Sequence, residues 1–179
     1  MSPGAEKSSC ASIFLVGPMG AGKTAVGRRL GKALGVPFYD TDLEIQKQTG
    51  VDIGFIFEKE GESGFRQREA EAIDRLTQLP SIVLATGGGA LLDPQNRSRL
   101  SQRGRVVYLR VSVTQQLRRT RLVANRPLLE DDSPEKTLAK LAGQREPMYE
   151  KMADLTINTN GRKVPAVTAE IINWVKGDR

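Results

Sequence analysis

Three glycines, a lysine and a threonine stand close together near the start of the chain, in GPMGAGKT at residues 17–24. Glycines leave successive backbone N–H groups bare, so these groups can curl around phosphate oxygens. The lysine of such a stretch reaches the β and γ phosphates of a nucleotide, and the threonine hydroxyl ligates Mg²⁺. The spacing Gly-x-x-x-x-Gly-Lys-Thr is that of a P-loop, so the stretch predicts a site for a nucleoside triphosphate. The residues expected to bind it are Gly20, Ala21, Gly22, Lys23, Thr24 and Ala25.

The residues on both sides of this stretch fit the same interpretation. SIFLV at residues 12–16 is apolar enough for a buried strand, and residues 24–34 place Val26, Leu30 and Leu34 on one face of a helix. A P-loop lies between a strand and a helix. The alternative, a glycine-rich turn with an exposed lysine, needs neither element. The context therefore favours nucleotide binding.

Two carboxylates, Asp40 and Asp42, follow a second short apolar run, VPFYD at residues 36–40, in the sequence DTD. The chain has no histidine, so a general base must be a carboxylate, a lysine, a tyrosine or water. We expect Asp40 to hold Mg²⁺ through water and Asp42 to point toward whatever lies beside the γ phosphate. A purely structural alternative is a capping box, in which Thr41 and Glu44 close the start of the next helix and Asp42 favours its dipole.

An arginine and a run of glycines mark two further places where a ligand can bind. Arg66, in GESGFR, lies in the first turn of a predicted helix, where a cation opposes the helix dipole. It is either a surface charge or a residue placed there for a ligand. Gly87, Gly88 and Gly89 follow the apolar run SIVLAT. They either form a strained turn or clear space for a ligand against the backbone.

Two more arginines stand in short motifs further along the chain. Arg126 opens RPLL in a polar, proline-marked stretch, and Arg145 stands in REPMY, late in the following predicted helix. Guanidinium groups match carboxylates and phosphates fork to fork. Arginines in these motifs therefore suit a small anionic substrate.

Short apolar runs alternate with longer segments of helical period along the whole chain. Strict alternation predicts a parallel sheet with helices on both faces, so the expected fold is α/β with three layers. In such a sheet, function gathers at the carboxyl ends of the strands. Residues 41–70 and 123–132 fit the sheet poorly and are predicted to form flaps over a site. The five expected strands are at residues 12–17, 36–40, 81–86, 105–111 and 154–158. The expected helices are at residues 24–34, 42–49, 53–60, 64–78, 94–102, 114–122, 134–151 and 164–176.

The composition is that of one globular domain over residues 1–179, with 39% hydrophobic and 27% charged residues. No apolar run is long enough to span a membrane, and Glu6 and Lys7 stand where a signal peptide has its apolar core. We therefore expect a cytoplasmic protein with a loose tail at residues 1–11. Cys10 is the only cysteine, which excludes an internal disulfide. The net charge is +6, and 17 of the 27 basic residues are arginine, which indicates anionic partners, either small molecules or nucleic acid.

The ordered set of these motifs resembles the shikimate kinase family, from about residue 12 to residue 176. The family shows a P-loop, then DTD, GE shortly before FR, GGG after the third strand, RPLL, R-x-P-x-Y and a closing TN turn. Each motif is weak alone, but the set in this order is highly specific. Here the motifs stand at Asp40-Thr41-Asp42, Gly61-Glu62, Phe65-Arg66, Gly87-Gly88-Gly89, Arg126 to Leu129, Arg145 to Tyr149 and Thr159-Asn160.

The resemblance implies the fold of a P-loop kinase similar to the nucleoside monophosphate kinases, with a substrate-binding segment at residues 41–70 and a lid at 123–132. It implies Mg²⁺-dependent transfer of the ATP γ-phosphoryl group to the 3-hydroxyl of shikimate, in chorismate and aromatic amino acid biosynthesis. Asp42 would contact the ring hydroxyls and orient or deprotonate the attacking one, and Arg126 would close onto the phosphates. The family's site residues fall on Lys23, Asp42 and Arg126 for catalysis, on Asp42, Arg66, Gly87, Gly88, Gly89 and Arg145 for shikimate, and on Arg119 and Arg162 for adenine.

Two other functions stay in view. A gluconate kinase shares the P-loop fold and also phosphorylates a hydroxylated carboxylic acid, but DTD, GGG and R-x-P-x-Y together argue against it. An ATP-dependent nucleic-acid-binding protein needs arginines spread along a face with aromatics to stack bases, whereas aromatics are only 5% here. We therefore expect a monomer whose partners are ATP and shikimate, without nucleic acid or membrane.

Overall fold

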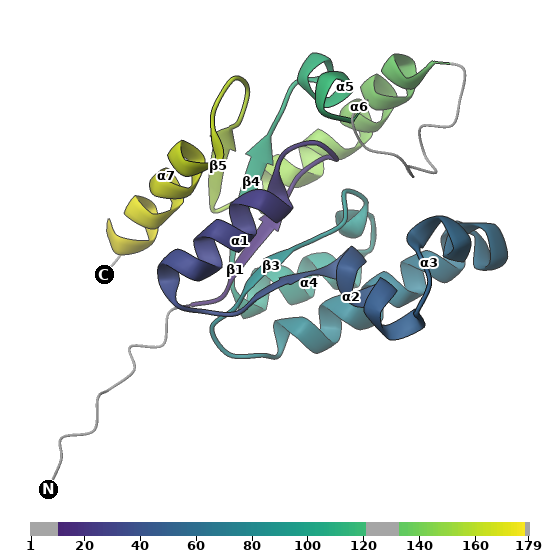
Figure 1. Cartoon of the computed structure of the whole chain (residues 1–179), viewed down its shortest axis with the longest axis horizontal. Helices are drawn as coiled ribbons and strands as arrows, with labels where there is room; N and C mark the ends of the chain where they lie inside the picture. Colours follow the sequence, from purple (N-terminus) through teal and green to yellow (C-terminus); the bar gives the residue numbers. More distant parts are fainter. Residues whose placement is uncertain (1–10, 121–132, 178–179) are drawn as a thin grey trace, which may run out of the picture.

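A five-stranded sheet forms the centre of the computed structural model, which describes residues 11–120 and 133–177. The strands are β1 Ile13–Val16, β2 Phe38–Asp40, β3 Val83–Ala85, β4 Arg105–Arg110 and β5 Leu155–Asn158. Their order in the sheet is β2-β3-β1-β4-β5, and every neighbouring pair is parallel (Figure 1). The α/β class and the five predicted strands are confirmed.

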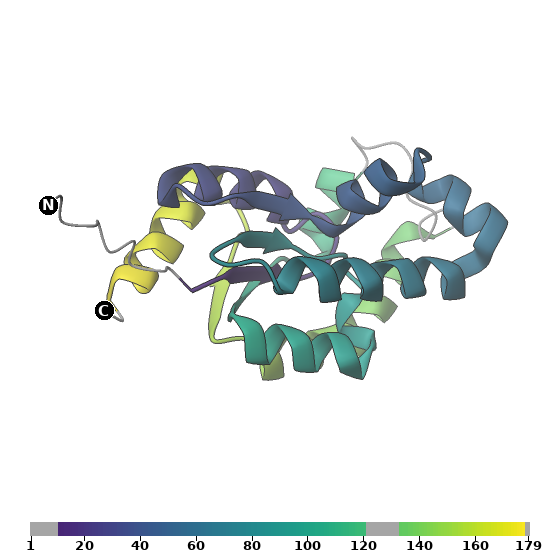
Figure 2. The same ribbon diagram turned by 90° about the horizontal axis from the view of Figure 1, so that it is seen from below.

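Helices cover both faces of this sheet. They are α1 Lys23–Leu34, α2 Thr41–Thr49, α3 Ile53–Thr77, α4 Pro94–Arg103, α5 Val113–Thr120, α6 Pro134–Met152 and α7 Val164–Gly177, with a 3-10 helix η1 at Ala90–Leu92. In β1, Ile13 and Leu15 pack into a core with α1 and α7, whereas Phe14 and Val16 pack into a core with α3, α4 and α6. Because all four are buried, the strand is apolar without alternation. Figures 1 and 2 show the three predicted layers.

The helix α2 and the first part of α3 form a smaller unit, which follows the carboxyl end of β2 (Figure 1). Gly61 interrupts the helical backbone of α3 with a φ of 69°, a conformation that glycine adopts without strain. The predicted break in this region is confirmed, but helical backbone resumes at residue 62 rather than 64, so Arg66 does not lie in a first turn. Ile45 and Ile56 of this unit pack into a small core with Phe65 and Ala72 from the second part of α3.

Some predictions lie beyond the part of the chain that the structure describes. These are the lid at residues 123–132 with Arg126, the tail up to residue 10, and Cys10. Within residues 11–120 and 133–177, none of the helices combines the length and apolar character needed to cross a membrane.

Candidate active site

The stretch GPMGAGKT forms a tight loop between β1 and α1. Gly17, Gly20 and Gly22 adopt positive φ angles of 142°, 77° and 92°, which are accessible to glycine but strained for other residues. A side chain at Gly17 would also stand 2.5 Å from the carbonyl oxygen of Leu109 in β4. The loop therefore needs these glycines to keep its shape.

The amino terminus of α1 has no side-chain cap. Its N-cap is Gly22, and its first turn contains no acidic residue. By contrast, Asp40, Asp52 and Asp93 cap α2, α3 and α4 by accepting hydrogen bonds from backbone N–H groups. Because no side chain caps this end of α1, the helix dipole favours an anion here, as the P-loop pattern predicts.

The Lys23 ammonium lies over the loop itself. Its Nζ donates to the carbonyl oxygens of Gly17 at 2.7 Å and Pro18 at 2.8 Å. The charge is therefore held where the predicted phosphates would bind. A lysine side chain is flexible, so it can exchange these carbonyl oxygens for phosphate oxygens.

Thr24 and Asp40 provide the oxygens expected for Mg²⁺. The Thr24 hydroxyl donates to Asp40 Oδ2 at 2.6 Å, between the start of α1 and the end of β2. Mg²⁺ prefers hard oxygen ligands and takes only one or two from the protein, with water and phosphate supplying the rest. Among the described residues, no three acidic, histidine or cysteine side chains gather into a metal site. The pair therefore fits Mg²⁺ that arrives with a nucleotide.

Asp40, and not Thr41, is the cap of α2. Asp40 Oδ1 accepts from the backbone N–H groups of Asp42 at 3.0 Å and Leu43 at 3.3 Å. The capping box considered from the sequence is therefore wrong. The Thr41 hydroxyl is used elsewhere: Thr41 is fully buried, and its Oγ1 accepts from the N–H of Gly87 at 3.0 Å. A contact between segments far apart in the chain thus overrides the local capping pattern.

The Asp42 carboxylate is directed into the site. Its Oδ1 is buried and has no hydrogen-bond partner among the described residues. This oxygen faces Gly87, because a side chain added there would contact it at 3.4 Å. Burial, with the negative charges of Asp40 and Glu69, raises the pKa of Asp42 to about 6, against the opposing effect of two nearby cations. A carboxylate with this pKa can accept a proton near neutral pH.

Gly87, Gly88 and Gly89 clear space for neighbouring groups. None of them has a positive φ, so the alternative of a strained turn is contradicted. A side chain at Gly87 would overlap the Glu69 carboxylate, whereas one at Gly88 would make ordinary contact with the P-loop backbone, 3.4 Å from the nitrogen of Met19. A side chain at Gly89 would overlap the guanidinium group of Arg66. The bare backbone at Gly87 and Gly89 therefore lets Glu69 and Arg66 of α3 approach this segment closely.

Arg66 is held by carboxylates one turn before it and one turn after it in α3. Its Nη1 donates to Glu69 Oε2 at 2.7 Å, and its Nη2 donates to Glu62 Oε1 at 3.2 Å. The side chain is only 21% exposed, so the alternative of a surface charge is contradicted. Its Nε is buried without a partner in the described part of the chain.

Glu69 also lies in the candidate site, although no sequence motif points to it. It is fully buried, with Oε2 bound to Arg66 and Oε1 lacking a partner among the residues described. Burial raises the pKa of Glu69, while Arg66 and Arg145 lower it. A signal was present in the spacing, because Glu69 lies on the apolar face of α3 with Phe65 and Ala72. A glutamate is rarely buried there without a partner.

Arg145 brings a second guanidinium group to the glycine segment. It is 7% exposed, and its Nη1 lies 3.6 Å from where a side chain at Gly88 would stand. Its Nε has no partner within residues 11–120 and 133–177. Tyr149, one turn later in α6, donates its hydroxyl hydrogen to the carbonyl oxygen of Gly88. Arg66 and Arg145 therefore both lie against the three glycines with donors unused, which suits an anionic ligand.

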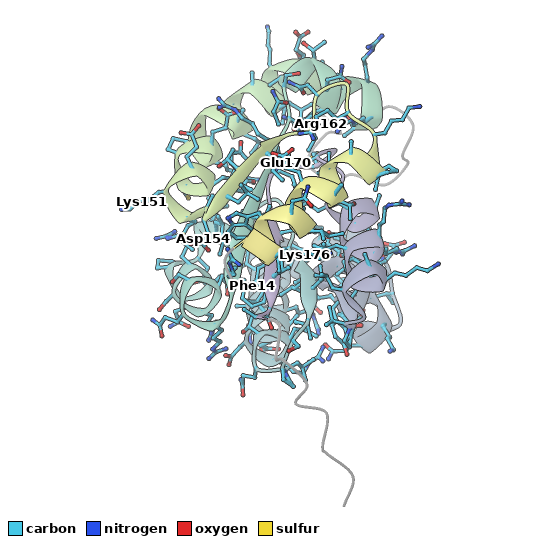
Figure 3. All side chains as sticks on the ribbon, turned by 90° about the vertical axis from the view of Figure 1, so that its left-hand side faces the viewer. Phe14, Lys151, Asp154, Arg162, Glu170 and Lys176 are labelled. Carbon is cyan, nitrogen blue, oxygen red and sulfur yellow. The ribbon has the colours of Figure 1, made fainter. Side chains whose placement is uncertain are left out.

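The two arginines predicted beside adenine lie in different surroundings. Arg119 donates from Nη1 to Gly20 O at 2.8 Å and from Nη2 to Thr159 O at 2.9 Å, so it joins the P-loop to the turn after β5. Arg162 pairs with Glu170 of α7 at 2.7 Å, and Figure 3 shows the two together beside this helix. Arg119 is thus placed at the P-loop, whereas Arg162 is engaged with α7.

Similarity to known proteins covers nearly all of the chain. The family model for shikimate kinase matches residues 19–176. The protein named shikimate kinase 1 from Enterobacter sp. (strain 638) is 48% identical over 168 residues, which cover 93% of this chain and 97% of that protein. The structure of shikimate kinase from Acinetobacter baumannii in complex with shikimate has a TM-score of 0.92 at 47% identity, covering 94% of each chain. That of shikimate kinase from Bacteroides thetaiotaomicron has a TM-score of 0.85 at 28% identity, covering 93% of this chain and 98% of the other. Because sequence and fold agree over this length, the chain belongs to the shikimate kinase family.

Proposed function

We propose that the chain transfers the γ-phosphoryl group of ATP to the 3-hydroxyl of shikimate, giving shikimate 3-phosphate and ADP in chorismate biosynthesis. The observation that carries this proposal is the buried, unpartnered Oδ1 of Asp42. The charge of Asp42 interacts with Lys23 in the P-loop and with Arg66 in α3. The carboxylate therefore stands within range of both a phosphate site and an anion site, where a substrate hydroxyl can meet ATP.

The carboxylate of shikimate is bound by Arg66 and Arg145. Each guanidinium group has a buried Nε without a partner among the described residues, so each has a donor to spare. A carboxylate can accept two parallel N–H bonds from one guanidinium group. The ring of the substrate lies along the bare backbone of Gly87, Gly88 and Gly89.

In the reaction, the 3-hydroxyl oxygen forms a bond to the γ phosphorus, and the bond from that phosphorus to the bridging oxygen of ADP breaks. Asp42 orients the hydroxyl and accepts its proton. Lys23 stabilises the negative charge on the transferring group. Thr24, and Asp40 through water, would hold Mg²⁺, which would offset the charge of the β and γ phosphates.

The proposal extends to the oligomeric state, the location and the partners of the chain. We also propose that the chain acts as a monomer. Its location is cytoplasmic, with neither nucleic acid nor membrane as a partner, and the anionic substrates account for the excess of arginine.

Further residues complete the proposed nucleotide site. The backbone at Gly20, Ala21, Gly22 and Ala25 contacts the phosphates, Arg119 and Arg162 lie beside adenine, and Arg126 reaches the phosphates from the predicted lid.

Release of ADP distinguishes this function from its alternatives. With ATP and Mg²⁺ supplied, we expect ADP release to require shikimate and to stop when the metal is chelated. Gluconate, nucleoside monophosphates and DNA should give only the background rate. Equal release with gluconate would contradict the substrate, and release that depends on DNA would favour the nucleic-acid alternative.

Replacing Arg66 with lysine tests the carboxylate site. We expect Arg66→Lys to weaken shikimate binding by about 1.5 to 3 kcal/mol and to change ATP binding little, because a point charge cannot reproduce two parallel hydrogen bonds. Calorimetric titration with each substrate measures both affinities. The matched control is Arg68→Lys, since Arg68 pairs with Glu60 at the surface. Unchanged shikimate affinity in Arg66→Lys would place Arg66 outside the site.

A further inference from the structure

Two buried hydroxyl groups hold the backbone of the three-glycine segment. Thr41 Oγ1 accepts from the N–H of Gly87 at 3.0 Å, and the Tyr149 hydroxyl donates to the carbonyl oxygen of Gly88. Thr41 is 0% exposed and Tyr149 is 1% exposed, so neither bond competes with bulk water. The two hydroxyls reach adjacent residues from different elements, α2 and α6. We call Thr41 and Tyr149 together the hydroxyl clamp.

The clamp acts on a turn in which the carbonyl oxygen of Gly87 accepts locally from the N–H of Ala90 at 3.1 Å, while the N–H of Gly87 is bound by Thr41. Gly87 and Gly88 have no side chains to pack, and glycine has more backbone freedom than other residues. They lie between β3 and η1, so they are not part of a strand or helix. Yet Gly87 faces the Asp42 carboxylate, and Gly88 lies beside the guanidinium group of Arg145. A displacement of about 1 Å among such groups can lower a reaction rate by about 10²-fold.

Each hydroxyl of the clamp also stands next to a residue of the proposed site. Thr41 precedes Asp42 in the chain, and Tyr149 follows Arg145 by one turn of α6. The Tyr149 ring is stacked on Tyr108 of β4 with centroids 5.0 Å apart, which fixes the position of its hydroxyl. The two bonds therefore connect Asp42 to Arg145 through the glycine backbone.

We propose that Thr41 and Tyr149 are positioning residues for phosphoryl transfer, an inference that rests on the proposed function. By holding the glycine backbone, they set the separation between Asp42 and Arg145. Asp42 receives the reacting hydroxyl and Arg145 binds the carboxylate of the same substrate, so this separation must match the ring. Neither clamp residue needs to touch the substrate.

Removing one hydroxyl at a time tests the clamp by kinetics. Thr41→Val and Tyr149→Phe keep the size of each side chain and remove its hydrogen bond to the glycine backbone. Tyr149→Phe also removes a hydrogen bond between the Tyr149 hydroxyl and Arg145, so Thr41→Val is the cleaner test of the two. We expect each to lower kcat/KM for shikimate by about 10-fold and to change the KM for ATP by less than about 2-fold. Because both changes loosen the same backbone, the double variant should lose less than the product of the two effects.

Two matched variants separate positioning from general disruption. Thr41→Ser keeps the hydroxyl and should keep kcat/KM near the wild-type value. Tyr108→Phe removes a buried hydroxyl that has no partner among the described residues, so it should leave both substrates unaffected.

Hydrogen exchange at the Gly87 amide examines the clamp without using activity. Since this N–H donates to Thr41, we expect it to exchange about 10-fold faster in Thr41→Val and to be slow again in Thr41→Ser. Unchanged exchange in Thr41→Val, wild-type kinetics in both single variants, or equal effects on both substrates would overturn the clamp. A wild-type protein inactive with shikimate would instead refute the proposed function, and the exchange result would then decide the clamp alone.

Discussion

Replacing Asp42 with asparagine should lower turnover by about 10²-fold or more and, at the same time, make the protein more stable at neutral pH. Asparagine keeps the size of the side chain but cannot accept the proton of the attacking hydroxyl. Because the P-loop is unchanged, ATP should still bind. Steady-state kinetics measure the turnover, and a binding titration measures the affinity for ATP. Near-normal turnover in Asp42→Asn would leave Asp42 with only a structural role in the first turn of α2.

The gain in stability follows from the direction of the pKa shift. The pKa of Asp42 is raised from 3.8 to about 6, so between these values the folded state holds a proton that the unfolded state releases. Stability therefore rises as the pH falls from above 6 toward 3.8, and above 6 the buried charge destabilises the fold. We expect Asp42→Asn to add about 1 to 3 kcal/mol to the free energy of unfolding at pH 8 and less at pH 5. Urea unfolding at both pH values measures this; an equal change at both would exclude titration of Asp42 as the cause.

The same carboxylate should shape the pH dependence of activity. Since only the charged form accepts a proton, kcat/KM for shikimate should fall as the pH drops below about 6. This fall of kcat/KM at acid pH should be absent from the residual activity of Asp42→Asn. Asp74→Asn is a suitable control, because Asp74 is an exposed carboxylate of α3 paired with Arg103. Asp74→Asn should keep the wild-type turnover and the fall of kcat/KM below about pH 6.

Replacing Lys23 with methionine should lower turnover by about 10²- to 10³-fold, the loss typical of removing one group that stabilises charge in a transition state. In the structure the Lys23 ammonium is already held over the P-loop by Gly17 and Pro18. Methionine has a similar length without charge, so the loop should remain folded while the transferring phosphoryl group loses its cation. Single-turnover measurement of phosphoryl transfer at saturating ATP separates this effect from weaker binding.

Lys32 offers a matched control on the same helix. It lies exposed in the last turn of α1, so Lys32→Met removes an equal charge away from the loop. We expect its turnover to equal that of the wild type. If Lys23→Met also keeps full turnover, then holding the loop carbonyls is the whole role of Lys23 and the proposed phosphate contact is wrong.

Short-range patterns were sufficient for most of the fold and for the phosphate loop. The apolar runs at residues 12–17 and 81–86 contain β1 and β3, because strands covered on both faces must be apolar throughout. The sequence places the P-loop pattern between a predicted strand and a predicted helix, and in the structure it lies between β1 and α1. The 3-10 helix η1 was not predicted, since three residues are too few to show a period.

By itself, the sequence determined which segments become strands and helices, where the phosphate loop lies, and which family the motifs resemble, because each depends on residues close together in the chain. Only the tertiary structure decided how the site is assembled. Thr41 caps no helix because its hydroxyl meets Gly87, 46 positions away, and Tyr149 meets Gly88 across 61 positions. Glu69 is brought into the candidate site by burial against residues of other elements. The pKa of Asp42 is raised by burial and by the charges of Asp40 and Glu69, which belong to separate elements. Such long-range contacts leave no local period in the sequence, since they arise only when packing brings distant segments together.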